Sequence, residues 1–159
     1  MKPERSSLLR IICLAAALSL VLPAVQAAGP DQSQAQKIAD QYVATRQASN
    51  SNPQKEYEAG RIVVADLDAD GQDEIVVPWT MLGPTYWHHG VTVLARMGQR
   101  YQPAGETQEP LGSVEDLQVR DGVIVLHTKW PGLNDPRCCP SVAKTLRYRW
   151  QSGRLAPAP

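Results

Sequence analysis

Residues 62–77 read IVVADLDADGQDEIVV, and this stretch decides the fold because two apolar runs flank an acidic turn. The runs are rich in β-branched residues, which favour strands. Gly71 allows the sharp reversal that would pair the two runs as a hairpin. Five carboxylates lie within the nine residues of the turn. Alternating carboxylates can direct several oxygens at one hard cation, and calcium takes about six to eight oxygen ligands. The stretch therefore predicts a β-hairpin whose turn is a candidate calcium site.

The acidic turn matches the first nine positions of a calcium loop. The twelfth position, where an EF-hand has its bidentate acid, is Val77, and the flanking segments are predicted strands. The turn therefore resembles the calcium hairpins of FG-GAP or integrin-type propeller blades. The alternative is a solvated Asp-rich turn without metal, because Asp and Gly favour turns for backbone reasons alone. The candidate ligands are Asp66, Asp68, Asp70, Gln72 through its main-chain carbonyl, and Glu74.

Residues 1–27 have the pattern of an export signal, with three basic residues, an apolar run of twelve and small residues before a cut after Ala27. The run is too short to span a bilayer stably, and no later segment is apolar enough to do so. Residues 28–159 are then expected to form a single α+β domain, periplasmic or secreted after cleavage. Cys13 lacks the small-residue setting of a lipid-attached cysteine, so no lipid anchor is expected.

The charge balance of the expected mature chain argues against nucleic-acid binding. Residues 28–159 carry 13 basic and 15 acidic side chains. A nucleic-acid-binding domain of this size usually carries a basic field. We therefore expect no nucleic-acid partner.

The periodicity predicts an α+β fold with one N-terminal amphipathic helix packed on a mostly antiparallel β-meander of six or seven strands. An apolar stripe at helical spacing runs through residues 31–50, and Asp31 or Ser33 can cap its start. Asp121-Gly122 separates two apolar runs and is a strong hairpin signal. The main expected strands are residues 61–66, 74–81, 91–97, 114–120, 123–130 and 144–150.

Cys138 and Cys139 are the two cysteines of the expected mature chain. In an oxidising compartment two thiols tend to pair. Adjacent Cα atoms lie about 3.8 Å apart, below the usual disulfide range, so a bond between them would be strained and easily reduced. Three interpretations stay open. The pair forms a vicinal disulfide that staples a turn, or it acts as a redox switch or soft-metal site with His127, His88 or His89, or it remains two thiols or bridges to another chain.

The cysteine pair also carries a family resemblance. The run DPRCCPS at 135–141, followed by LRYRW at 146–150 and a glycine turn, resembles the C-terminal signature of the LppP/LprE family of bacterial envelope lipoproteins. An upstream strand, Asp-rich turn and Val-rich strand are similar too, so the resemblance spans about residues 60–155. It implies residence in the cell envelope and a shared fold, and it implies no catalytic activity. The chain departs from the family because it has no evident lipidated cysteine.

Two long irregular segments, residues 82–90 and 131–140, are the expected contact surface, because long ordered loops often carry function. The first holds Tyr86, Trp87, His88 and His89, which could stack on a sugar or peptide or hold a metal. The alternative is a surface loop whose aromatic rings are tucked against the sheet. His127, on an expected strand, is predicted to be half-buried and hydrogen-bonded.

The leading functional hypothesis is an exported, non-enzymatic binding or interaction module for a protein, peptide or glycan ligand of the cell envelope. No nucleophile elbow, HExxH, CxxC or phosphate-binding glycine loop is present in the sequence, so no catalytic residue is predicted. One alternative is a redox- or metal-responsive envelope protein that uses Cys138 and Cys139. A second is a small hydrolase whose catalytic metal is held by the acidic turn.

Overall fold

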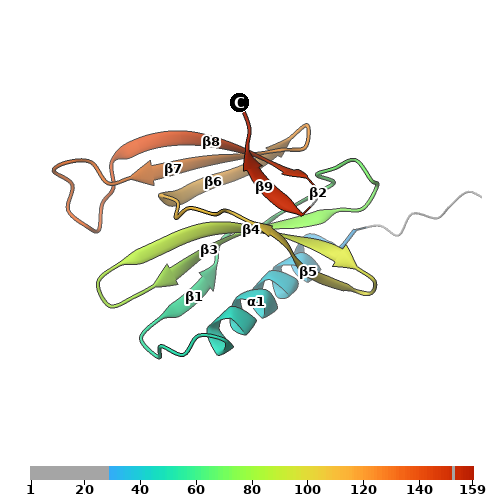
Figure 1. Cartoon of the computed structure of the whole chain (residues 1–159), viewed down its shortest axis with the longest axis horizontal. Coiled ribbons are helices and arrows are strands. Elements are labelled where there is room, and N and C mark those ends of the chain that lie inside the picture. Colours follow the sequence, from blue (N-terminus) through green and yellow to red (C-terminus); the bar gives the residue numbers. More distant parts are fainter. Residues whose placement is uncertain (1–28, 152) are drawn as a thin grey trace, which may run out of the picture.

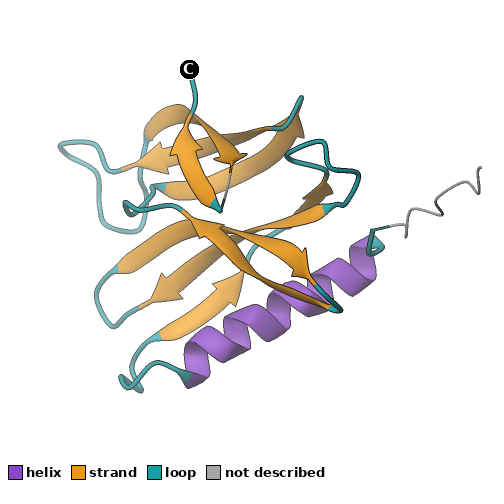
Figure 2. Ribbon diagram, turned by 45° about the vertical axis from the view of Figure 1, so that its right-hand side comes forward, coloured by secondary structure: helices purple, strands orange, loops and turns teal. Residues whose placement is uncertain are grey.

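Three layers of secondary structure make up the protein (Figures 1 and 2). The computed structural model describes residues 29–151 and 153–159, so the predicted signal peptide lies outside the described residues. A helix, α1 (Gln32–Ala48), lies on one face of a five-stranded sheet, and a four-stranded sheet lies on the other face. No helix in these residues has the length and apolar character needed to cross a membrane.

Both sheets are antiparallel, and the fold is α+β with mostly β structure. The five-stranded sheet, called sheet A, has the order β1-β3-β4-β5, with β2 also paired to β3. Its strands are β1 (Glu56–Ala59), β2 (Val63–Ala65), β3 (Glu74–Leu82), β4 (Trp87–Met97) and β5 (Arg100–Glu106). Sheet B has the order β6-β7-β8-β9, formed by β6 (Ser113–Arg120), β7 (Val123–Trp130), β8 (Val142–Gln151) and β9 (Arg154–Pro157).

The expected single meander of six or seven strands is thus corrected to nine described strands in two sheets. The short strand β1 was missed because its sequence, EYEA, offers no apolar run. The two hairpins expected from local sequence are confirmed. Strand β2 pairs with β3 across the acidic turn, and β6 pairs with β7 across Asp121 and Gly122, which both have positive φ.

Pro78 in β3 explains why the neighbouring edge is divided into β1 and β2. Proline has no N–H and cannot donate to a ladder. The Pro78 carbonyl points toward this edge and accepts a 2.7 Å hydrogen bond from Gly60 N. In an antiparallel sheet the nitrogen and the carbonyl of one residue face the same neighbouring strand, so the N–H that proline lacks is missing on this edge. Pairing with β1 stops at Trp79, and pairing with β2 begins at Val76.

Small residues let α1 lie close to sheet A. The side chain of Asp31 caps the helix by accepting a 2.8 Å hydrogen bond from Gln34 N. Ala35 and Ala39, one helical turn apart, are fully buried. They share an apolar cluster with residues of sheet A and of the segment before β2, namely Ile62, Ile75, Val77 and Leu94.

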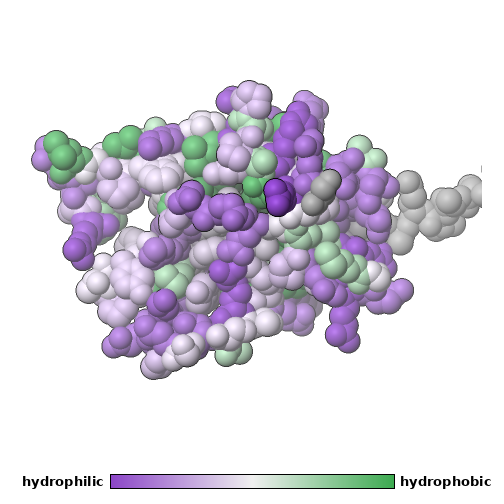
Figure 3. All heavy atoms as spheres, viewed as in Figure 1, coloured by the Kyte–Doolittle hydropathy of each residue, from purple (hydrophilic) through white to green (hydrophobic). Residues whose placement is uncertain are grey.

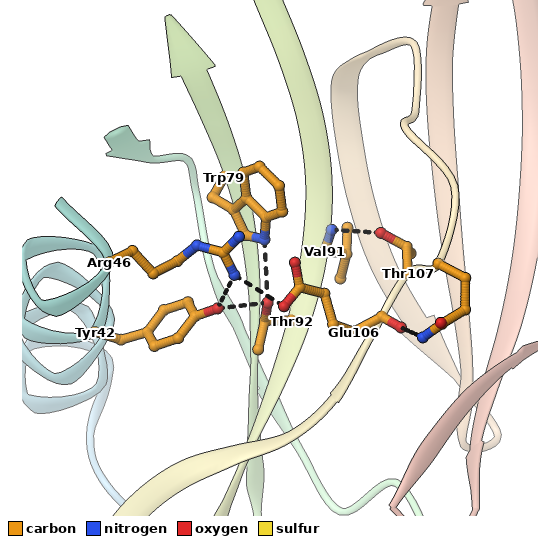
Figure 4. Close-up of polar contacts among 8 residues, drawn as sticks. Tyr42, Arg46, Trp79, Val91, Thr92, Glu106 and Thr107 are labelled. Atoms are coloured by element: carbon orange, nitrogen blue, oxygen red, sulfur yellow. Dashed lines mark hydrogen bonds and ion pairs between the residues drawn. The ribbon is translucent and has the colours of Figure 1, made fainter. Parts of the chain in front are cut away.

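A polar and aromatic cluster around Arg46 fixes the C-terminal half of α1 on the sheet (Figure 4). Arg46 Nη1 donates to Tyr42 Oη at 2.6 Å and to Glu106 Oε2 at 2.8 Å. The guanidinium carbon lies 4.2 Å from the centroid of the Trp79 ring, within cation–π range. Burial opposes the charge, but the hydrogen bonds to Glu106 and Tyr42 outweigh it and raise the pKa of Arg46. Thr92, fully buried, joins the cluster through Tyr42 Oη and Trp79 Nε1.

Replacing Arg46 tests this cluster. Arg46→Ala removes the cation–π contact and leaves Glu106 without its ion pair, so we expect the free energy of unfolding to fall by about 1–2 kcal/mol. Arg46→Lys keeps the charge but loses the planar group, and we expect an intermediate loss. Urea denaturation measures both. Lys37→Ala, at an exposed position of the same helix, is the matched control. Equal stability of the Arg46→Ala and Lys37→Ala proteins would contradict the role given to Arg46.

Candidate functional site

Two loops that are far apart in sequence meet at one end of the molecule. The turn between β3 and β4, residues 83–86, belongs to sheet A, and the loop between β7 and β8, residues 131–141, belongs to sheet B (Figure 1). Both loops line one cavity of about 1040 Å³, which we call the two-loop cavity. Arg137 Nη1 joins them by donating to the carbonyl oxygen of Thr85 at 3.1 Å. The segment 82–90, expected to be irregular, is corrected to the turn 83–86, because residue 82 ends β3 and residues 87–90 begin β4. This turn and the loop 131–141 are parts of one concave surface.

Asp135 organises the longer loop. Its carboxylate accepts hydrogen bonds from Gly132 N at 2.7 Å, from Ser141 N at 2.7 Å and from Ser141 Oγ at 3.0 Å. The main-chain bond from Gly132 is the largest cause that lowers the pKa of Asp135, followed by the bonds from Ser141. One ionised side chain thus ties the start of the loop to its end.

The cysteines lie at the outer part of the same loop. Cys138 and Cys139 are joined as a vicinal disulfide, both residues are exposed, and both line the two-loop cavity. Of the three interpretations drawn from sequence, the structure has the disulfide. The proposed soft-metal site has no counterpart among residues 29–151 and 153–159, where the one group of metal-binding side chains that comes together contains neither cysteine nor histidine.

The aromatic residues at the cavity are open to solvent. Tyr86 and Trp87 are 40% and 53% exposed, so neither ring is buried against the sheet, although the Tyr86 ring is partly covered by its own turn. The Tyr86 ring lies over Gly83, where an added Cβ would come within 2.8 Å of it, and meets the ring of His88 edge to face at 5.3 Å between centroids. Glycine at position 83 therefore sets the position of the Tyr86 ring.

The two histidines of this segment differ in environment. His89 is half-buried, and its Nδ1 lies 2.9 Å from Thr80 Oγ1. Burial, and then the neighbouring His88, lower the pKa of His89, and Glu115 opposes this fall. His127, expected to be half-buried, is exposed instead, with its Nδ1 3.3 Å from Thr145 Oγ1. The reason is strand alternation, because its neighbours Leu126 and Thr128 take the two buried positions.

Most polar side chains of the two-loop cavity are already engaged within the protein. Glu115 accepts from Ser113 Oγ at 3.0 Å and lies 3.7 Å from Lys129 Nζ. Asp135 is held by its own loop, whereas the Arg137 guanidinium uses one of its donors on Thr85. The rest of the lining is largely apolar and rigid, and includes Pro84, Trp87, Leu111, Pro131, Pro136 and Pro140. Such a lining favours a ligand that buries flat apolar groups.

The acidic turn is a second candidate site, at the opposite end of the molecule (Figure 1). One carboxylate oxygen from each of Asp66, Asp68 and Glu74 lies within 4.8 Å of the others. Two oxygens that each coordinate calcium at about 2.4 Å are at most about 4.8 Å apart, so these three can share one ion. Asp70 is not in this group, and its oxygens accept hydrogen bonds from the main-chain and side-chain nitrogens of Gln72.

Glu74 is the buried member of the acidic group. It is 3% exposed, and its Oε2 accepts a 2.9 Å hydrogen bond from Leu67 N. Burial raises the pKa of Glu74 to about 7, the bond from Leu67 opposes the rise, and the neighbouring acids Asp68, Asp70 and Asp66 add to it. The turn lines a smaller depression of about 490 Å³ that shares no residue with the two-loop cavity.

No family model, curated protein or solved structure matches this chain. The chemistry of the two sites is therefore read from their own residues. Sequence reasoning missed the bridge from Arg137, and no sequence signal could have found it because the acceptor is a main-chain carbonyl.

Asp135→Asn tests how the long loop is held. An amide offers a single acceptor oxygen without charge, so we expect hydrogen exchange of the Ser141 amide to become at least several-fold faster while the melting temperature changes little. Because the folded pKa of Asp135 is lowered, the hydrogen bonds are fully formed above the ordinary carboxyl pKa and are lost as the pH falls through the lowered value. Asp116→Asn, on β6, is the control. An unchanged exchange rate at Ser141 would contradict this role.

Proposed function

We propose that the protein is an exported, non-enzymatic binding module that holds an extended peptide segment in the two-loop cavity. The observation that carries this proposal is the convergence of two loops from different sheets on one cavity, beside the exposed rings of Tyr86 and Trp87. Exposed apolar surface that borders a concave site is typical of ligand recognition. A volume of about 1040 Å³ suits several residues of an extended chain.

The chemistry of the cavity favours a peptide with proline or aromatic side chains over a glycan. A sugar presents many hydroxyl groups and needs free hydrogen-bonding partners, but Ser113, Glu115 and Asp135 are engaged within the protein. Rigid aromatic and proline surfaces suit segments in the polyproline II conformation, which dock in aromatic-lined grooves. The unused donors of Arg137 can bind main-chain carbonyls of the ligand.

Export and envelope residence are part of the same proposal. They are supported by the signal-like pattern of residues 1–27 and by the resemblance of residues 60–155 to the LppP/LprE family. A binding role at the two-loop cavity is preferred over hydrolysis at the acidic turn because the turn lines only the smaller depression, of about 490 Å³ against about 1040 Å³.

Titration with two probes tests the ligand class. A blocked hexaproline peptide is expected to bind the oxidised protein, and Trp87→Ala is expected to weaken that binding at least about tenfold, a loss of about 1.4 kcal/mol. Isothermal titration calorimetry measures both affinities, with a neutral tetrasaccharide as the second probe.

Met97→Ala is the matched control, since Met97 is also an exposed apolar residue, 49% exposed, but lies at the end of β4 away from the two-loop cavity. Equal hexaproline affinity of wild-type protein and Trp87→Ala, or no binding of the peptide at all, would overturn the proposal. Binding of the tetrasaccharide alone would assign the cavity to glycans.

We further propose that calcium braces the acidic hairpin through Asp66, Asp68 and Glu74. The convergence of their oxygens supports this, and a divalent cation would offset the repulsion among them. The ligand set expected from sequence also included Asp70 and the carbonyl of Gln72, but the Asp70 oxygens accept hydrogen bonds from Gln72, so the proposal rests on the three converging residues. The ion would hold β2 to β3 at the end of the hairpin and would have a structural role.

Thermal melting in calcium and in chelator tests the brace. At about a hundredfold excess over the dissociation constant, binding to the folded state adds about 2.7 kcal/mol, which raises the melting temperature by several degrees. The measurement is made near pH 8, above the raised pKa of Glu74. Glu74→Gln is expected to abolish the rise, whereas Asp73→Asn, which changes an acid of the same turn outside the group, should keep it. Identical curves in calcium and chelator would remove the proposal.

A further inference from the structure

The vicinal disulfide lies between two independent anchors of the long loop. On its N-terminal side, Arg137 reaches across to the Thr85 carbonyl. On its C-terminal side, Ser141 is held by Asp135, which also holds Gly132. The disulfide is exposed and forms part of the cavity wall. It is therefore open to a reagent from solvent, and the base of the loop does not depend on it.

Closure of the disulfide constrains Arg137. In an extended chain, neighbouring side chains point to opposite sides. A bond between Cys138 and Cys139 brings both sulfurs to one side and constrains the backbone around the peptide bond between them. Arg137 and Cys138 are also the two central residues of a turn that Cys139 N closes by donating to the Pro136 carbonyl at 3.0 Å, so the disulfide constrains the turn that contains Arg137. The guanidinium of Arg137 is the hydrogen-bonded link between the two loops. The covalent state of the cysteines is thus coupled to the link across the cavity.

We propose that Cys138–Cys139 is a thiol–disulfide exchange site that reacts with dithiols, and that its reduction releases the Arg137 bridge and changes ligand binding in the two-loop cavity. The exchange chemistry stands by itself, whereas the effect on ligand binding rests on the proposed function. Arg137 places a cation beside Cys138, and this charge attracts the attacking thiolate.

The exchange consumes one dithiol. A thiolate of the dithiol attacks one cysteine sulfur, the sulfur–sulfur bond breaks, and the other cysteine leaves as a thiolate. The second thiol of the reagent then attacks the reagent's own sulfur in the mixed disulfide. This step frees the first cysteine and closes a disulfide within the reagent. Two electrons pass from the dithiol to the protein. The two protons of the dithiol end on Cys138 and Cys139, so the protein is left with two thiols.

Reduction leaves the base of the loop in place. The bonds of Asp135 to Gly132 and Ser141 do not involve sulfur, so the loop keeps its closed ends. What changes is the segment from Arg137 to Cys139, together with the contact to Thr85. The expected response is therefore local, with the two sheets unaffected.

Limited proteolysis with trypsin measures directly how accessible the Arg137–Cys138 peptide bond is in each state of the disulfide. The oxidised protein is compared with protein that has been treated with dithiothreitol without denaturant, alkylated and desalted, so that trypsin never meets the reductant. Mass measurement should show two alkylated cysteines. We expect cleavage after Arg137 to be at least tenfold faster in the reduced form. Cleavage after Arg100, an exposed residue at the start of β5, should not change and serves as the internal control.

A Cys138→Ser, Cys139→Ser double variant gives the same comparison without alkylation, and it is expected to match the reduced form and ignore dithiothreitol. Both forms are also titrated with the blocked hexaproline peptide, and we expect at least fivefold weaker binding without the disulfide. Equal cleavage after Arg137 in the two states, resistance of the disulfide to native reduction, or equal acceleration at Arg100 would each overturn the exchange site as a local switch.

The two proposals fail in different ways. If hexaproline binds neither form but cleavage after Arg137 depends on the disulfide, the peptide-binding function is wrong and the exchange site stands. If hexaproline binds both forms with equal affinity, the binding function stands and the regulation of it is overturned.

Discussion

Packing of sheet A against sheet B is the constraint on which the rest of the structure depends. The core between them takes residues from both sheets, including Val76, Val91, Val93, Leu117, Ile124 and Leu126. Trp150 joins the sheets at one edge, where its Nε1 donates to the Ala104 carbonyl at 3.1 Å. The close approach needs glycine at position 105, because a Cβ there would lie 2.9 Å from the indole. Since each sheet supplies one loop of the two-loop cavity, the cavity exists only while this packing holds.

The three remaining features are distributed around that core. The Arg46 cluster attaches α1 to the outer face of sheet A, opposite sheet B (Figure 4). The acidic turn ends the β2–β3 hairpin at one end of the molecule, and the two-loop cavity lies at the other (Figure 1). Hydrophobic atoms mark the outer tip of the longer loop in Figure 3, in agreement with the full exposure of Leu133. A structural ion and a ligand would therefore not compete for the same residues.

Local patterns predicted the local structure well. The helix is capped by Asp31, one of the two caps predicted, and the Asp121-Gly122 turn has positive φ at both residues, as that dipeptide indicates. The division into two sheets could not be predicted, because it depends on which strands fail to pair. The division of one edge of sheet A into β1 and β2 could not be predicted either, because its cause, Pro78, lies on the neighbouring strand β3. The burial of His127 was predicted wrongly, because the alternation of residues along a strand shows which side chains share a face of the sheet but does not show which face is buried. In the acidic turn, the spacing of the sequence predicted five calcium ligands, whereas the structure brings together the carboxylate oxygens of three residues, Asp66, Asp68 and Glu74. The bridge from Arg137 to a main-chain carbonyl leaves no trace in sequence.

The central claim is that two loops from different sheets form one site. Solution NMR of the oxidised protein tests it most directly, through nuclear Overhauser effects between the Arg137 side chain and protons of residues 85–87. The bridge to Thr85 predicts several such effects. It also predicts that backbone relaxation reports both loops to be as rigid as the strands they join. The absence of any effect between the loops, together with independent fast motion of residues 131–141, would contradict the account.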